Sequence, residues 1–160
     1  MQTIVVGYDG SEAAERALAR AAELAEALSA RLVVVSVSGL EGVPALDPEG
    51  LPPLPMSGPL SIGGTIPVPE AASESAGELE KHAQRRLERA RTTLAGRRLE
   101  ADYVARIGDP AETLLEVAEK RDADLVVVGS REHGFVERLL APPVEETVAR
   151  HAERDVLLVH

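Results

Sequence analysis

Short runs of β-branched and other apolar residues alternate with segments of helical period, and this alternation limits the possible folds more than any other feature of the chain. The predicted strands are Thr3–Val6, Leu32–Val37, Leu99–Arg106, Leu125–Val128 and Val156–Val159. Short apolar runs are typical of strands buried on both faces, and strands that alternate with helices form parallel sheets. Leu99–Arg106 alternates apolar and polar residues, so it is predicted near an edge. The sequence therefore predicts an α/β fold with a doubly wound, five-stranded parallel sheet and helices on both faces.

Four helices are predicted between these strands, over about residues 12–28, 74–96, 110–121 and 143–151. Ser11 is a suitable N-cap for the first helix, whose apolar stripe runs from Ala14 to Leu28. Asp109 is predicted to cap the third helix, with Pro110 in its first position, where a missing N–H leaves no helical hydrogen bond unmade.

Residues 39–72 interrupt this pattern. They contain eight of the eleven prolines and six of the thirteen glycines, and their apolar residues show neither helical nor strand periodicity. The chain of 160 residues is predicted to form one domain, 1–160, that carries this segment as an insert. Three interpretations remain open for the insert: a lid over a ligand site, a partner-binding arm built on the apolar stretch Leu51–Met56, or a disordered linker.

The composition excludes several classes of function. A formal net charge of -10 disfavours nucleic acids and anionic membrane surfaces, both of which need a basic footprint. The absence of cysteine excludes disulfides and thiol catalysis, and the four histidines show no metal-ligand spacing, so no metal site is expected. No apolar run approaches the ~20 residues of a membrane span, and no signal peptide is evident, so the cytoplasm is the expected location.

Ligands of doubly wound sheets bind beyond the carboxyl ends of the strands, at the point where the strand order reverses. The segments predicted to lie there are Gly7–Ser11, 39–72, Ile107–Pro110 and Gly129–Pro143. A candidate binding site is therefore expected among these four segments.

Four pieces of the chain, in the right order, resemble the universal stress protein family. They are Ile4–Ser11, Gly108–Ala111, Ala123–Ser130 and Val144–Val159, and the resemblance covers about residues 1–38 and 74–160. It implies a Rossmann-like fold of the adenine nucleotide alpha hydrolase-like type and a role in the stress response. It also implies a homodimer formed through the last strand, Val156–Val159, and protein partners that the sequence does not identify.

Members of this family that bind ATP carry Gly-x-x-Gly, nine residues, and then Gly-Ser or Gly-Thr. Here Gly129 matches the first glycine, but Glu132, Pro142 and Pro143 stand at the other three positions. Each proline lacks the N–H that would bind phosphate, Pro143 also lacks the hydroxyl, and Glu132 adds negative charge. The sequence therefore predicts a non-catalytic, universal stress protein-like domain with weak or no ATP binding, and no cofactor is expected.

The nucleoside end of the site leaves an alternative open. The resemblance implies that Asp9 contacts the adenine side and that the backbone at Val37 touches the base. The candidate adenine-nucleotide site consists of these two residues with Gly129, Ser130 and Arg131. With Arg131 or Arg138 in place of the lost donors, the chain would be an adenine-nucleotide sensor that binds AMP or ATP. An enzyme is not expected, because no Walker A sequence is present and no Gly-x-Ser-x-Gly elbow surrounds Ser130.

Overall fold

A computed structural model describes residues 2–39, 70–130 and 143–160, and every structural statement below concerns these residues. The strands are β1 (Thr3–Gly7), β2 (Arg31–Ser38), β3 (Glu100–Ile107), β4 (Leu125–Gly129) and β5 (Asp155–Val159). The helices are α1 (Glu12–Leu28), α2 (Glu70–Leu94), α3 (Pro110–Lys120) and α5 (Val144–His151). All strand pairs are parallel and the order is β3-β2-β1-β4-β5, so the predicted doubly wound sheet and the edge position of its third strand are confirmed.

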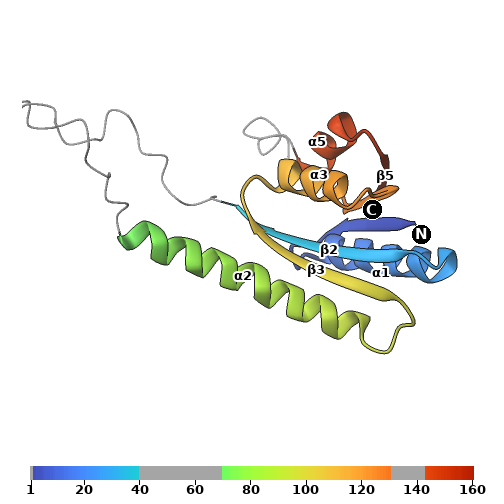
Figure 1. Cartoon of the computed structure of the whole chain (residues 1–160), viewed down its shortest axis with the longest axis horizontal. Helices are drawn as coiled ribbons and strands as arrows, with labels where there is room; N and C mark the ends of the chain where they lie inside the picture. Colours follow the sequence, from blue (N-terminus) through green and yellow to red (C-terminus); the bar gives the residue numbers. More distant parts are fainter. Residues whose placement is uncertain (1, 40–69, 131–142) are drawn as a thin grey trace, which may run out of the picture.

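Helices cover both faces of the sheet, with α1 and α2 on one side and α3 and α5 on the other (Figure 1). Alternate residues of the central strands supply the two halves of the core. In β1, for example, Ile4 and Val6 face α1 and α2, while Val5 faces α3 and α5. This double burial explains why the central strands are almost wholly apolar.

Small residues bring α1 close to the sheet. Its buried face is made almost entirely of alanine, and Leu18 is its one large buried side chain. The prediction that Leu28 belongs to this buried stripe is wrong, because its side chain is 53% exposed. Leu28 is the last residue of α1, directly before Ser29, which ends the helix in the left-handed conformation, and the stripe has left the core by that point.

Helix α2 begins at Glu70, earlier than the predicted start at 74, so residues 70–72 belong to the helix and not to the insert. Its buried side chains, Ala83, Leu87, Ala90 and Leu94, pack over β2 and β3. The first turns of α2 extend beyond the strands (Figure 1). The interpretations of the insert as a lid, an arm or a linker concern residues 40–69, which lie outside the described residues.

Both predicted N-caps are confirmed. The Ser11 hydroxyl accepts a hydrogen bond from the Ala14 N–H (3.1 Å), and the Asp109 carboxylate accepts one from the Glu112 N–H (2.9 Å). None of the helices in the described part of the chain is long and apolar enough to cross a membrane.

The strand order reverses between β1 and β4. The chain runs outward from β1 through β2 to β3, then returns to place β4 and β5 on the other side of β1. A crevice is therefore expected where the carboxyl ends of β1 and β4 diverge.

Candidate functional site

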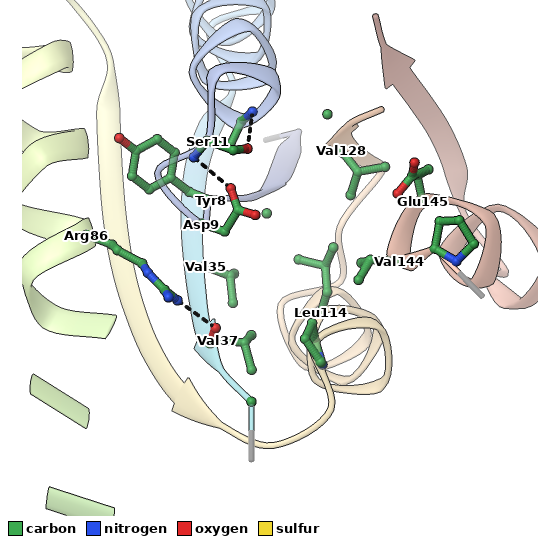
Figure 2. A pocket seen from close by; sticks show the side chains of 16 residues that line it. Tyr8, Asp9, Ser11, Val35, Val37, Arg86, Leu114, Val128, Val144 and Glu145 are labelled. Atoms are coloured by element: carbon green, nitrogen blue, oxygen red, sulfur yellow. Dashed lines mark hydrogen bonds between the residues drawn. The ribbon is translucent and has the colours of Figure 1, made fainter. Parts of the chain in front are cut away.

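A cleft of about 690 Å³ lies at this crevice. The ends of β1, β2 and β4 form its floor, the first turns of α1, α3 and α5 form its walls, and Arg86 enters from α2. Figure 2 shows Val37 and Arg86 on one side, Val144 and Glu145 on the other, and Asp9 between them. Four of the five predicted site residues lie at this edge of the sheet: Asp9, Val37 and Gly129 line the cleft, and Ser130 directly follows β4.

Asp9 shapes the turn that starts α1. Its Oδ1 accepts a hydrogen bond from the Ser11 N–H (2.9 Å), which is an Asx turn, and Gly10 between them has φ +79°. This left-handed backbone conformation favours glycine. The turn places the Asp9 carboxylate on the wall of the cleft (Figure 2). The structural role of Asp9 is therefore shown, and a ligand role remains a prediction.

The carbonyl of Val37 accepts a hydrogen bond from Arg86 Nη1 (3.1 Å). Arg86 is half-buried, and no carboxylate of the described residues lies within ion-pair distance of it. This contact was not predicted from the sequence. A signal was available, since position 86 directly precedes buried Leu87 and follows buried Ala83 by three residues, so it borders the buried stripe.

Gly129 has a packing role that the sequence analysis did not foresee. A β-carbon on Gly129 would lie 2.3 Å from the backbone oxygen of Ala13 and 2.9 Å from the backbone nitrogen of Ala14. No side chain fits there unless α1 moves away. Directly after it, the Ser130 N–H donates to the Val159 carbonyl (2.8 Å), so this donor extends the β4–β5 pairing.

Among the described residues, the α5 side of the cleft offers few phosphate-binding groups. Pro143 occupies the N-cap of α5 and makes no side-chain capping bond, and Glu145 and Glu146 lie in the first turn. The other predicted residues of this loop, Arg131, Glu132, His133, Arg138 and Pro142, lie outside the described residues.

A polar cluster of buried Tyr8, half-buried Glu15 and exposed Arg89 links α1 to α2 beside the cleft. The Tyr8 hydroxyl donates to Glu15 Oε1, and Arg89 Nη2 lies 3.4 Å from the same oxygen. Burial, together with the hydrogen bond to Glu15 and its charge, raises the pKa of Tyr8 to about 12. The neutral phenol is thus the form that the folded protein stabilises.

The described residues contain no group of three or more histidine, aspartate or glutamate side chains arranged to hold a metal ion. The described lining of the cleft combines backbone groups, the Arg86 guanidinium, the Asp9 and Glu145 carboxylates and apolar side chains.

Fold and cleft together define a doubly wound α/β protein with a cleft at its topological switch point, where proteins of this class bind ligands. The model of the universal stress protein family matches residues 1–57 and 59–160, so the chain belongs to this family. A universal stress protein of Thermus aquaticus is 32% identical, over 99% of this chain and 98% of the relative. One from Mycobacterium tuberculosis is 30% identical, over 99% and 96%.

A solved structure of a universal stress protein in complex with cAMP is also similar to this chain. Its identity is 26% and its TM-score is 0.59, and the match covers 99% of this chain and 96% of that one. The predicted family is therefore confirmed.

We expect Gly129→Ala to destabilise the protein by about 3 kcal/mol, the upper end of the usual cost of overpacking, because the new methyl group meets backbone and not a flexible side chain. Gly77→Ala is the matched control. Nothing lies within 4 Å of a β-carbon at exposed, helical Gly77, so we expect a gain of about 0.5–1 kcal/mol. Urea unfolding followed by circular dichroism measures both. Similar unfolding free energies for the two variants would contradict the packing role of Gly129.

Because of Tyr8, we expect the free energy of unfolding to decrease at alkaline pH. Because its pKa is raised in the folded state, its contribution is fully present below about pH 10 and is lost as pH rises toward about 12. The difference between the pKa values of Tyr8 in the folded and unfolded states, about two units, corresponds to about 2–3 kcal/mol in the free energy of unfolding. In Tyr103→Phe, Tyr8 is the one remaining tyrosine, and its ultraviolet titration reports the ionisation directly. A midpoint near 10 in the folded variant, equal to that in urea, would refute the prediction.

Proposed function

We propose that this protein is a non-catalytic member of its family that acts in the cytoplasm, in the stress response, by regulation or protein interaction. In this proposal it binds ATP weakly or not at all in the manner of the ATP-binding members. The observation that carries the proposal is Pro143 at the N-cap of α5, where neither an N–H nor a hydroxyl is available to a phosphate.

The energetic argument depends on the number of lost donors. A hydrogen bond to a charged group contributes about 1.5–3 kcal/mol, and Pro142 and Pro143 each remove one candidate N–H. Losing two such bonds lowers affinity by about a hundredfold or more. The use of the Ser130 N–H by Val159 adds to the shortage of donors on this side.

The described lining of the cleft supports a non-catalytic role. Histidine does not occur in this lining. Its two hydroxyls serve the fold, since Ser11 caps α1 and Tyr8 bonds Glu15. A nucleophile paired with a base, the usual basis of covalent hydrolysis, is therefore not formed by the described lining.

A second candidate function, an adenine-nucleotide sensor for AMP or ATP, is favoured by the cleft itself. The Asp9 turn is intact, and a relative of similar fold is known in complex with cAMP. In this proposal Arg131 or Arg138 replaces the lost phosphate donors.

We also propose a homodimer formed through β5. This strand is at the edge of the sheet, and its apolar side chains are half-buried on both faces: Leu157 and Val159 border the α1 side, and Val156 and Leu158 the α3 side. An edge strand whose apolar side chains are only half-buried on both faces favours pairing with a second chain.

Restoring the ATP-binding signature of the family tests the proposal that the protein binds ATP weakly or not at all. We expect the triple variant Glu132→Gly, Pro142→Gly, Pro143→Ser to bind ATP at least about a hundredfold more tightly than the wild type, because two N–H donors and a hydroxyl return. Isothermal titration calorimetry measures this, with adenosine, which lacks phosphates, as the control ligand. Equal and tight ATP binding by the wild type and the variant would contradict the proposal.

Leu157→Lys tests the dimer. We expect a wild-type mass of twice the 17.0 kDa chain by light scattering, and a shift toward the monomer in Leu157→Lys, because a charge at the edge strand opposes pairing. Leu28→Lys is the control, since it adds the same charge at an exposed leucine that ends α1 and does not belong to β5. A monomeric wild type, or equal masses for the two variants, would refute the proposed interface.

A further inference from the structure

We propose that the outer face of α2 is an interaction surface for a second copy of this chain, on which two α2 helices pair antiparallel about a two-fold axis. The face is acidic in the first half of the helix and basic in the second half, so each half meets the opposite charge on the other copy. This surface is separate from the cleft and from β5.

The charges of α2 are arranged symmetrically along one side of the helix. Glutamates occupy positions 70, 74 and 78, and basic residues follow at positions 81, 85 and 89. A spacing of four residues keeps each set on one face, and the step of three residues from 78 to 81 keeps both sets on the same face. Each acidic position has a basic position at the same distance from the midpoint between Leu79 and Glu80. In an antiparallel pair, position 78 therefore faces 81 of the other copy, 74 faces 85, and 70 faces 89.

This face points away from the core. Lys81 and Arg85 each lie two residues before a buried side chain of α2, and residues two apart in a helix point about 200° apart. The side chains of Glu78 and Lys81 are 57% and 64% exposed, and Arg85 is exposed as well. Helix α2 packs over β2 and β3, whereas β5 forms the opposite edge of the sheet (Figure 1). The proposed surface and the β5 edge therefore lie on different sides of the molecule.

Within one chain, the neighbouring charges of this face repel each other. Like charges four residues apart destabilise a helix, whereas opposite charges at this spacing stabilise it. Helices α1, α3 and α5 each place opposite charges at this spacing, in the pairs Glu12–Arg16, Glu116–Lys120 and Glu146–Arg150. In α2 the same spacing joins Lys81 to Arg85, and no ion pair or hydrogen bond with a described residue holds the Arg85 side chain. Acidic groups from another chain would offset this repulsion.

The helix dipole does not account for the centre of the pattern. The dipole favours acids in the first turn and bases in the last turn, and its effect fades within these turns. Glu78 and Lys81 lie well inside α2, which runs from Glu70 to Leu94. They form an ion pair within the chain (2.9 Å), and in the antiparallel arrangement this pair meets the same pair of the other copy. The four charges then alternate around the two-fold axis, and such networks contribute more than isolated surface pairs.

Both signs of charge on this face favour a second copy over a polyanion. Residues 81–98 contain seven of the seventeen basic residues and one of the twenty-seven acidic residues, so this segment attracts anions. An extended polyanion would also contact the glutamates of the first half, whereas a second copy meets both halves with opposite charge. Exposed ion pairs contribute little each and are screened by salt. The association is therefore weak, and at low protein concentration or high salt the β5 dimer remains alone.

The experiment uses the full chain with Leu157→Lys, so that β5 pairing does not contribute, and measures mass by sedimentation equilibrium up to about 1 mM protein, where weak pairs become populated. At about 100 mM NaCl the Debye length is about 10 Å, which screens the overall net charge more than charges in contact. We expect self-association under these conditions and its loss at about 500 mM NaCl.

Two charge reversals in this chain test the pairing. Reversal of the basic half (Lys81→Glu, Arg85→Glu) or of the acidic half (Glu74→Lys, Glu78→Lys) should weaken self-association by about tenfold or more, because contacts beside the axis become repulsive. An equal mixture of the two variants should associate at least as tightly as the parent, since their contacts join opposite charges. Arg16→Glu, Arg20→Glu on α1 is the matched control, because it changes the net charge equally at exposed positions and should have a much smaller effect. Circular dichroism checks the fold of each variant.

Four results would overturn the inference. A Leu157→Lys chain that stays monomeric at about 1 mM would show that α2 does not pair, and would leave the β5 interface standing if the wild type is a dimer. If that monomer binds a fluorescent decaglutamate peptide, and the basic-half reversal abolishes this binding, the occupant is an acidic partner and not a second copy. Self-association that survives both reversals would place the contact on another surface. An equal loss in the α1 control, or no association in the mixture, would assign the effect to net charge and not to complementary contacts.

Discussion

The contact between the first turn of α1 and the end of β4 determines the geometry of the whole cleft. The backbone of Ala13 occupies the space that a β-carbon on Gly129 would need. This close approach is possible because the face of α1 on the sheet is made of alanines, and it fixes the direction in which α1 leaves the Asp9 turn. The position of the α1 wall beside the carboxyl ends of β1 and β4 follows from this contact.

This contact changes the meaning of the one signature glycine that the chain retains. Gly129 is compatible with phosphate binding, but the backbone of α1 excludes any larger residue at this position in any case. The packing constraint would remain if phosphate binding were lost. The presence of Gly129 beside Glu132, Pro142 and Pro143 is therefore no evidence for a working phosphate loop.

The sequence predicted the features that local chemistry determines. The apolar runs and their alternation with helices indicate the five strands and their parallel direction. The caps at Ser11 and Asp109 follow from side chains that accept hydrogen bonds from backbone N–H groups three residues later. The contacts that define the site are not local. Arg86 meets Val37 across 49 residues, and Arg89 meets Glu15 across 74, and both depend on how α2 packs on the sheet. A charge pattern on a helix does not specify that packing.

The strand ends and the helices contribute differently to this site. The strand ends supply a crevice whose shape is set by sheet topology and by the α1 contact, and this shape persists when side chains change. The charged side chains of the described lining come from outside the strands: Arg86 from α2, Glu145 from α5 and Asp9 from the turn before α1. Substitutions at these positions can therefore change the charge of the cleft without altering the fold. Family membership thus indicates where the cleft lies more firmly than which ligand the cleft would select.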